Sequence, residues 1–541
     1  MRKKVLYRII LILISTALLL VGCQDTSTNG SDKTEEPKDK TETPAPTEAT
    51  EAPPDEKLEP VELVWYSLVD YERPDTDMVW EEINKYLSEK INATIDYNFY
   101  VWADYGEKIK TAITAGQYMD ILFTGSEFDF AVDVKRDAFL PIEDLIPEYL
   151  PGTYDLVPQG AWDAVTIDGH IYGIPAYKDL ADRFSCLYNK TMMDKYNIDV
   201  PQSGEWSVMQ DMLPFLYEAK AARDEDEPDL ASVPIMRMMN TLRRYYPYEE
   251  LITMVGANIP GLDAFEGKGS GEIAFNIYET DEYRENCHLL KQLVDDGIYP
   301  SDYTNFDPDK TLMNTGKLAA TFAAGYIEIK PDMYAGRETV LTTADFSVMT
   351  TMYVQSSVQA LSHQTNNPER ALMFLELLNT DKELANMVRF GIEGEHYLYN
   401  DEDRLDVTIS PRNANVGSYS DYAYYYWYGY QFGNIVAGDL PSAVSTNFSN
   451  LLAELNDNSI QDTNLGFLID TSSITNEFAA CSNVIAEYAS GTNLASGMVE
   501  DVDGTVDAFI AKLQANGSQK IIDEVQRQLT DWRASVGKTT N

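Results

Sequence analysis

Cys23 is the residue whose setting predicts a specific chemical modification. It follows Gly22 at the end of an apolar stretch from Ile9 to Val21, and four basic residues precede that stretch. This layout predicts a lipoprotein signal peptide over residues 1–22, cleavage after Gly22 and a diacylglycerol thioether on the Cys23 sulfur. An uncleaved membrane anchor is the alternative, but the stretch of 13 residues falls short of the ~20 needed to span a bilayer. We therefore expect a protein held by lipid on the extracellular face of a cell membrane.

Sequence motifs of catalysis and metal binding are not found. There is no HExxH, GxSxG or P-loop pattern, and the four histidines are scattered, so we expect neither an enzyme nor a cofactor. The run from Asp501 to Gly504 resembles part of a calcium loop, but Val499 and Ile510 stand where ligands are needed. We interpret it as a turn before a helix over 506–513. A carboxylate pair for glycoside hydrolysis is defined by its separation in space, so that alternative stays open.

The remaining cysteines predict no metal or redox site. Three follow Cys23, and they are too far apart in the chain for a CxxC pattern: Cys186, Cys287 and Cys481. We expect buried free thiols, with one disulfide between two of them as the alternative.

The charge balance disfavours nucleic acid as a partner. The chain has 41 Lys and Arg against 88 Asp and Glu, a formal net charge of −47, which becomes −51 once four N-terminal cations leave with the signal peptide. Nucleic acids bind to clustered Lys and Arg, so this balance argues against them. It also argues against adhesion to anionic wall polymers and favours a soluble body that the envelope repels.

Residues 23–60 are predicted to be a disordered tether. The stretch 24–60 contains no aromatic residue and one large aliphatic residue, Leu58, so it cannot bury enough apolar surface to offset the entropy of ordering. The tether allows the folded body to search the space above the membrane, and a passive spacer through the cell wall is equally compatible. The folded part starts near Val61, and its length favours two or three lobes.

The first part of the folded body alternates between strand and helix patterns. The strands are expected at 62–67, 93–102 and 120–123. One helix is expected at 75–90, between the first two strands, and a second, which ends at 115, between the last two. This order predicts a parallel sheet with right-handed crossovers, whose ligands sit beyond the carboxyl ends of the strands. A hairpin with an Asp168-Gly169 turn follows.

A second mixed region follows the hairpin. We expect a strand at 184–188, helices at 208–222 and 281–295, and an extended segment at 346–353. Paired helices should lie at 368–378 and 382–390, and most of the last 150 residues should be helical.

At these residues the chain resembles the extracellular solute-binding proteins of carbohydrate ABC transporters, of the maltose-binding-protein type. Five stretches carry the resemblance in order over some 320 residues: Gly116–Ile121, Asp168–Pro175, Leu187–Lys190, Pro201 to Trp206, and Asn367–Glu383. The end of the chain, from Gly391–Tyr397 to Glu524–Trp532, resembles a C-terminal module of uncharacterised role on lipoproteins of Gram-positive bacteria.

The resemblance implies an α/β, two-lobe periplasmic-binding-protein-like fold of type II with hinge strands, plus a mainly helical C-terminal part. Lobe 1 is expected at 61–180 and 346–395, and lobe 2 at 181–345 and 396–541, which includes the helical module. Hinge strands are expected near Pro175–Asp182 and Ala344–Val348.

A carbohydrate, in particular an oligosaccharide, would then close the lobes for delivery to the permease subunits of an importer, with the binding protein acting as a monomer. Two alternatives remain open: a surface glycoside hydrolase, or a sensor that presents ligand to a membrane kinase.

Candidate ligand contacts in lobe 1 follow the three predicted parallel strands. Sugar sites combine aromatic rings with carboxylates, amides and Arg, which suits residues of these types at the strand ends. The resemblance places an aromatic-and-acid pair after the third strand. The lobe 1 candidates are Tyr66, Asp70, Trp102, Ser126, Glu127 and Phe128. The alternative for each is ordinary packing or helix capping.

Candidate contacts in lobe 2 rest on the resemblance and on aromatic density. Arg243 and Tyr246 lie where relatives contribute an aromatic residue, and Arg243 could bind hydroxyls or a carboxylate. Tyr326 follows Gly325 where the family often carries a stacking Trp. The segment 419–432 has nine aromatic residues in 14, and from it we choose Trp427 as facing the cleft.

Overall fold

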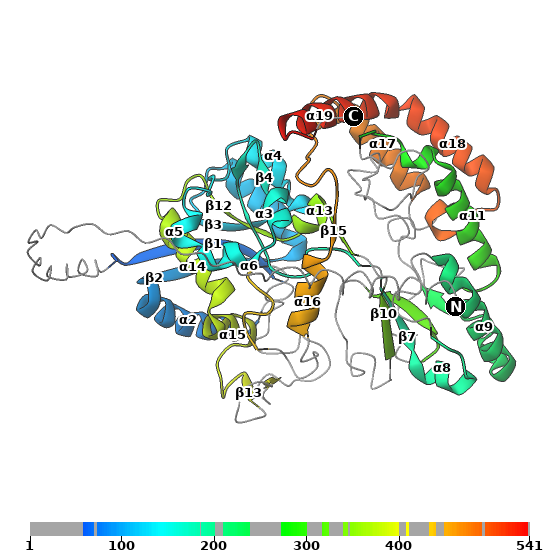
Figure 1. Cartoon of the computed structure of the whole chain (residues 1–541), viewed down its shortest axis with the longest axis horizontal. Helices are drawn as coiled ribbons and strands as arrows, with labels where there is room; N and C mark the ends of the chain where they lie inside the picture. Colours follow the sequence, from blue (N-terminus) through cyan, green and yellow to red (C-terminus); the bar gives the residue numbers. More distant parts are fainter. Residues whose placement is uncertain are drawn as a thin grey trace, which may run out of the picture. The chain divides into compact units, whose positions relative to one another are not determined.

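The computed structural model describes residues 58–69, 73–183, 185–200, 209–237, 272–299, 316–323, 339–343, 347–399, 407–409, 432–439, 448–489 and 493–538. Residues from Leu58 onward form one compact unit. Among the described residues of this unit, buried apolar side chains gather in three clusters: core 1, which includes Trp65 and Phe374, core 2, which includes Tyr188 and Leu293, and core 3, which includes Tyr278 and Phe509. The residues of core 1 and core 2 come from a sheet and its helices, whereas those of core 3 come mainly from helices that Figure 1 shows: α11 (Asp281–Asp295), α17 (Thr475–Tyr488), α18 (Val502–Ala515) and α19 (Ser518–Ser535).

Core 1 is built on a five-stranded sheet in the order β2-β1-β3-β12-β6. The strands are β1 (Val61–Val69), β2 (Ala93–Val101), β3 (Ile121–Thr124), β6 (Ile174–Pro175) and β12 (Val358–Leu361). β1 pairs in parallel with β2 and β3, as the alternation of strand and helix predicts, whereas β12 runs antiparallel between β3 and β6. The predicted hairpin is present as β4 (Thr166–Ile167) and β5 (His170–Ile171).

Helices surround this sheet and supply the rest of core 1. They are α2 (Thr76–Ile91), α3 (Trp102–Thr114), α4 (Phe130–Lys135), α5 (Ile146–Tyr149), α6 (Pro151–Leu156), α7 (Gln159–Ala164), α13 (Thr351–Val354), α14 (Pro368–Thr380), α15 (Lys382–Phe390) and α16 (Phe448–Asp457). In α2 the buried residues recur at helical spacing, so one face of the helix covers the sheet. β13 (Tyr397–Tyr399) and β14 (Val407–Ile409) form a separate hairpin after α15.

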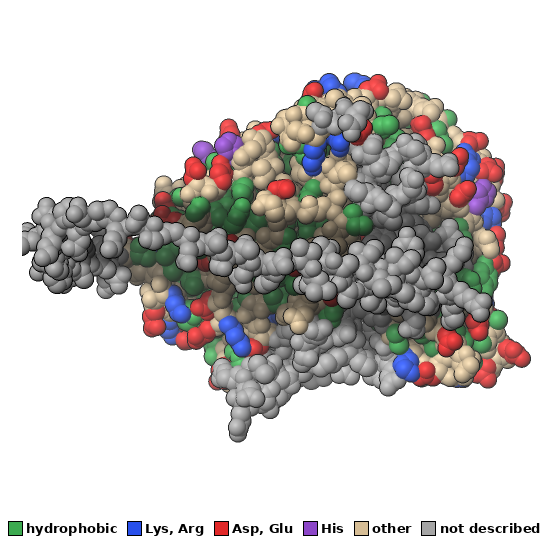
Figure 2. Space-filling view, in the orientation of Figure 1, with side chains coloured by type: hydrophobic (Ala, Val, Ile, Leu, Met, Phe, Trp, Pro, Cys, Tyr) green, Lys and Arg blue, Asp and Glu red, His purple; other side chains and the backbone are tan. Residues whose placement is uncertain are grey.

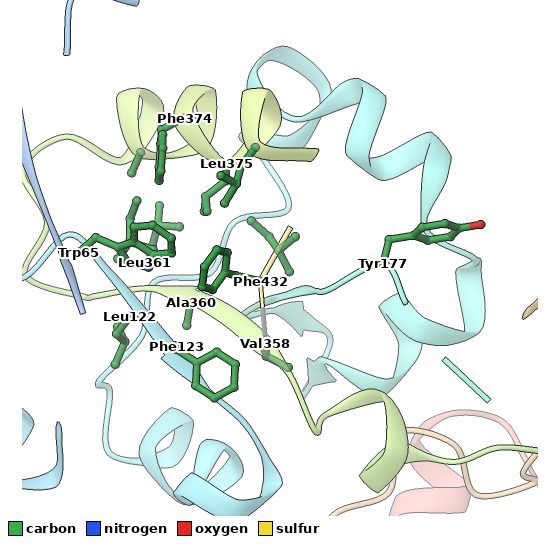
Figure 3. Close-up of a cluster of buried hydrophobic side chains, with 14 of the residues drawn as sticks. Trp65, Leu122, Phe123, Tyr177, Val358, Ala360, Leu361, Phe374, Leu375 and Phe432 are labelled. Carbon is green, nitrogen blue, oxygen red and sulfur yellow. The ribbon is translucent and has the colours of Figure 1, made fainter. Parts of the chain in front are cut away.

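Trp65 lies at the centre of core 1. Its ring is fully buried and meets Phe374 of α14 at 5.4 Å and Phe432 at 4.8 Å between centroids, both edge to face (Figure 3). Burying a side chain of this size stabilises a fold by about 1.5–3 kcal/mol or more. These contacts bring together segments that are far apart in the sequence.

Core 2 packs on a four-stranded sheet in the order β10-β7-β9-β8. The strands are β7 (Ser185–Asn189), β8 (Met236–Arg237), β9 (Ala320–Ala323) and β10 (Thr339–Thr343), and the helices are α8 (Lys190–Tyr196), α9 (Met209–Asp226) and α11 (Asp281–Asp295). The predicted helix at 281–295 matches α11 in both bounds. Its C-terminal half contributes Leu290 and Leu293 to core 2.

Core 3 lies between the C-terminal helices and the N-terminal half of α11. Its elements are η3 (Ile277–Glu279), α17 (Thr475–Tyr488), η6 (Leu494–Ser496), α18 (Val502–Ala515) and α19 (Ser518–Ser535). The run from Asp501 to Gly504 differs from the expected turn, because it is the start of α18. The Asp501 carboxylate accepts a hydrogen bond from the Gly504 N–H at 2.9 Å and so acts as the helix N-cap.

One part of the expected division into lobes differs from the structure. The prediction assigns all of 396–541 to lobe 2, but Phe432, Ile435 and α16 lie in core 1. The described residues at 432–439 and in α16 therefore pack with the first sheet and not with the second. The reason is long-range packing on Trp65, which no local pattern encodes.

The predicted buried state of the three cysteines agrees with the structure: Cys186, Cys287 and Cys481 are buried, and no disulfide joins any of them to another described residue. Acidic and basic side chains are interspersed over the described part of the face in Figure 2. In the described part of the chain, no helix combines the length and the apolar character needed to cross a membrane.

Candidate ligand-binding site

The carboxyl ends of β1, β2 and β3 meet at one edge of the first sheet, because these strands are parallel. The same edge includes the start of β12 and the end of β6, since Val358 pairs with Thr124 on one side and Pro175 on the other. Ligands of such sheets bind beyond this edge. The loops that follow β2, β3 and β6, and the segment before β12, are therefore the candidate site.

Aromatic rings form a continuous group at this edge. Phe128 meets Phe123 at 5.7 Å and Tyr105 at 5.2 Å on its inner side, and both of these partners are buried. On its outer side Phe128 meets Trp102 at 5.5 Å, edge to face. Trp102 remains 49% exposed although it is a large apolar residue. The half-buried Phe128 thus supports an exposed indole ring, which suits stacking on the apolar face of a ligand.

The loop that carries Phe128 is fixed by the segment before β12. The Ser126 N–H donates to the Gln355 carbonyl at 2.9 Å. A Cβ atom at Gly125 would lie 2.4 Å from that same carbonyl oxygen, so only glycine allows this approach. The short helix η1 (Ser126–Phe128) follows, and in it Glu127, the residue before Phe128, is exposed. Glu127 can therefore offer a carboxylate to a hydroxyl-bearing ligand.

A buried polar cluster follows β6 at the same edge. The Lys178 ammonium donates to the Ser356 hydroxyl at 2.7 Å and lies 5.4 Å from the centre of the Tyr353 ring. The Tyr353 hydroxyl donates to Asp179 Oδ2 at 3.0 Å. Asp179 Oδ1 is buried and has no hydrogen-bond partner among the described residues. Burial lowers the pKa of Lys178 and raises the pKa of Asp179, and the nearby Lys178 charge opposes the second shift.

This cluster was missed in the sequence because the segment 175–182 was interpreted only as a hinge. Lys178 and Asp179 follow a strand end, which is the same signal that identified Glu127 and Phe128. Tyr353 and Ser356 precede a strand, and no sequence rule connects them with residue 178.

Four of the predicted lobe 1 residues lie together at the carboxyl edge: Trp102, Ser126, Glu127 and Phe128. Tyr66 does not join them. It is 4% exposed, stacks on Tyr100 and accepts a hydrogen bond at its hydroxyl from the Gln117 amide, which precedes β3 at the opposite edge. The alternating strand pattern at this position directs the Tyr66 ring into the packing beneath α3, so we leave it out of the candidate site.

The other predicted residues lie outside the described part of the chain. They are Cys23, Asp70, Arg243, Tyr246, Tyr326 and Trp427. In the described ranges there is no group of three or more His, Cys, Asp or Glu side chains that could hold a metal ion. The described part of the candidate site contains aromatic rings, hydroxyls and charged groups, which can bind a polar organic ligand.

The fold and this edge define a protein that binds a solute between two α/β lobes. Residues 82–392 match the bacterial extracellular solute-binding protein family, and the chain belongs to that family. Residues 463–534 match a domain of unknown function, DUF3502. The resemblance found in the sequence is thereby confirmed.

Curated relatives agree with this assignment. The chain is similar to a carbohydrate ABC transporter substrate-binding protein of Streptococcus pneumoniae serotype 4, with 22% identity over 473 residues that cover 85% of this chain and 89% of the relative. It is also similar to the fructooligosaccharide ABC transporter substrate-binding protein FusA of the same organism, with 21% identity over 41% of this chain and 42% of the relative.

Solved structures show the same fold. The N-glycan transport solute-binding protein NgtS from Streptococcus pneumoniae superposes with a TM-score of 0.70 at 20% identity, covering 87% of this chain and 99% of that one. A solute-binding protein of Bifidobacterium longum infantis, described as binding HMO, has a TM-score of 0.57 at 16% identity and covers 88% and 99%. The predicted type II binding-protein fold is confirmed.

Proposed function

We propose that this protein is the lipid-anchored substrate-binding subunit of an ABC importer and that its ligand is a carbohydrate, in particular an oligosaccharide. The observation that carries the proposal is the exposed Trp102 ring, supported by Phe128, at the carboxyl edge of the first sheet, where the neighbouring residue Glu127 is also exposed. A ring beside a carboxylate matches the two surfaces of a sugar, its apolar C–H face and its hydroxyls.

The printed names of the relatives support the same ligand class. They include a carbohydrate-transporter protein, a fructooligosaccharide-transporter protein and an N-glycan transport protein solved with Man5GlcNAc. Each of these names an oligosaccharide or carbohydrate, although they name different ones. The class of ligand is therefore supported, and the particular sugar is left to experiment.

Capture occurs by closure of the two lobes in this proposal. Each lobe offers part of the site, so the ligand binds the closed arrangement more tightly and shifts the population towards it. The second lobe would contribute Arg243, Tyr246, Tyr326 and Trp427, and Asp70 would join the first-lobe edge. The closed protein then delivers the ligand to the permease subunits of the importer.

The protein acts as a monomer on the extracellular face of the membrane in this account. The thioether-linked lipid on Cys23 holds it there, and residues 24–60 provide the reach. Binding without turnover distinguishes this role from the glycoside hydrolase alternative. A sensor for a membrane kinase would use the same site and differ in the membrane partner that it contacts.

A thermal-shift and calorimetric panel tests the proposal. The panel contains Man5GlcNAc, kestose and glucose oligosaccharides, with the corresponding monosaccharides as controls. We expect one oligosaccharide class to raise the melting temperature and to bind at one molecule per chain with no product released. Product formation would support the hydrolase, and absence of binding across all oligosaccharides would contradict the carbohydrate assignment. The Trp102→Ala variant is compared with Leu398→Ala, because Leu398 is a similarly exposed apolar residue at 43% and lies in β13, away from the edge.

A further inference from the structure

The C-terminal domain of unknown function shares a helix with the second sheet. The N-terminal half of α11 packs in core 3 through Tyr283 and Cys287, whereas its C-terminal half packs in core 2 through Leu290 and Leu293. The backbone that precedes α18 also lies directly on α11, since a Cβ atom at Gly497 would be 2.4 Å from the Leu290 carbonyl oxygen. Core 2 and core 3 are therefore joined as one body.

Among the described residues, the chain passes between core 1 and this body at three places, and these three connections are paired with one another. The first and second are hydrogen-bonded to each other, because Asp182 and Val348 each donate a backbone N–H to the carbonyl of the other at 2.8 Å. The third is β15 (Ile460–Gln461), which pairs in parallel with β11 (Val348–Met349). The Ile460 N–H donates to the Ser347 carbonyl at 2.8 Å, and the Asp462 N–H donates to the Met349 carbonyl at 3.0 Å.

Just beyond β15, the third connection contacts elements of core 1 on one side and the C-terminal helix α19 on the other. On the core 1 side, the Gly466 N–H donates to the Thr351 hydroxyl at 2.8 Å. Gly466 has a φ of +93°, and a Cβ atom there would lie 2.9 Å from the Asp163 carbonyl oxygen of α7. On the C-terminal side, the Arg533 guanidinium of α19 donates to Asn464 Oδ1 at 2.9 Å. The chain between residues 462 and 466 is thus fixed to α7, α13 and α19.

We propose that the C-terminal module makes β15 the third strand of the hinge and thereby confines the movement between lobes to bending about one axis. Two adjacent connections permit both bending and twisting of the lobes. A third connection, bonded to the outer edge of the second and fixed at both ends, resists twisting because twisting would break its backbone pairing. This inference rests on the proposed function, in which the lobes close on a ligand.

For ligand binding, the consequence is that the two lobes of the unliganded protein adopt fewer open arrangements. If twisted arrangements are excluded, a larger fraction of the unliganded protein is competent to close, and the apparent affinity rises with that fraction. The module would improve ligand capture in this way without contacting the ligand.

The test measures the distribution of distances between lobes in the absence of any ligand. Spin labels are attached at Glu81→Cys on α2 and Glu218→Cys on α9, both exposed, in the full chain carrying Cys23→Ala. The three native cysteines that remain are buried and protected from labelling. Pulsed electron paramagnetic resonance should give one narrow distribution for this chain. We expect Gly466→Ala to broaden it about twofold, because the new methyl group pushes β15 away from α7.

Gly537→Ala is the matched control. Gly537 also has a positive φ, of +74°, but nothing lies within 4 Å of its Cβ position, so this variant should leave the distribution unchanged. Thr351→Val removes only the acceptor of the Gly466 N–H and should broaden the distribution to a smaller extent, which provides the test if Gly466→Ala fails to fold. Equal widths in the parent chain, Thr351→Val and any folded Gly466→Ala would overturn the inference. A width that depends on Thr351 and Gly466, with no change on adding any oligosaccharide of the panel, would support the third strand while contradicting closure.

Discussion

Asp182 and Val348 exchange two backbone hydrogen bonds, both of 2.8 Å, at the point where the chain leaves the first sheet and returns to it. Lys178, Asp179 and Tyr353 lie within five residues of this pair along the chain, and Lys178 is hydrogen-bonded to Ser356, which precedes β12. The candidate hinge and the candidate ligand edge are therefore adjacent. A ligand held at the edge would lie beside the strands that bend when the lobes close.

Trp102→Ala should weaken oligosaccharide binding and leave stability nearly unchanged. The indole is about half exposed, so its removal takes a stacking surface from the ligand and little packing from the core. We expect a loss of about 1–2 kcal/mol, roughly 5- to 30-fold in affinity, by calorimetric titration. Unchanged affinity beside an unchanged melting temperature would remove Trp102 from the site.

Phe128→Ala should reduce both binding and stability. Its ring contacts Phe123 and Tyr105 on one side and supports Trp102 on the other, so the variant loses core packing as well as the platform. We expect affinity to fall by about as much as in Trp102→Ala and the free energy of unfolding by about 2 kcal/mol. A variant that melts lower but binds as tightly as the parent would show that Phe128 is a core residue alone.

Tyr66→Phe should affect stability and not binding. The variant removes the buried hydroxyl that accepts a hydrogen bond from Gln117, the residue that lies between α3 and β3. The expected cost is about 0.5–1.5 kcal/mol in the free energy of unfolding, measured by chemical denaturation. A clear loss of sugar affinity in this variant would return Tyr66 to the site.

Asp179→Asn should stabilise the protein at neutral pH. Burial raises the pKa of Asp179 above its ordinary value of 3.8. The folded state then holds its proton more tightly than the unfolded state, so this group lowers stability as pH rises from about 4 through the folded-state pKa. The Asn variant removes that loss, and its advantage in melting temperature should grow from pH 4 to pH 7. An advantage that shrinks over this range would contradict the assignment of a desolvated carboxylate.

Cys23→Ala should release the protein from membranes while ligand affinity stays the same. The lipid on Cys23 is the proposed attachment, and the tether separates it from the folded body. Fractionation of cells followed by titration of the released protein provides the measurement. Equal retention of the variant in the membrane fraction would contradict the lipoprotein assignment.

Local signals in the sequence predicted most elements of the first sheet and several helices well. The bounds predicted for α11 and α15 agree with the structure because each has a side chain at its N-cap, Thr280 and Asp381, that accepts hydrogen bonds from the first turn. Trp102 was expected at the end of a strand but begins α3, since the chain turns directly from β2 into that helix. The predicted end of the strand is wrong by one residue, but Trp102 still lies at the carboxyl edge of the sheet.

Contacts between distant segments could not be predicted in the same way. Phe432 packs on Trp65, and β15 pairs with β11, although no local pattern connects either pair. Alternation along β1 shows that Tyr66 lies on the opposite face of the sheet from Trp65. Because helices cover both faces of this sheet, both faces are buried, and alternation does not distinguish a core residue from a site residue. The sequence therefore predicted the sheet edge that carries the candidate site, but it did not distinguish which residues near that edge belong to the core.

The distance between spin labels on α2 and α9, measured with and without saturating oligosaccharide, tests the central claim most directly. The label sites Glu81 and Glu218 belong to the first and second sheets' helices, so the measurement is independent of the tether. We predict that the mean distance shifts to a single new value when the sugar that binds in the calorimetric panel is added, and that Trp102→Ala requires more sugar for the same shift. An unchanged distance distribution at full occupancy would contradict capture by lobe closure.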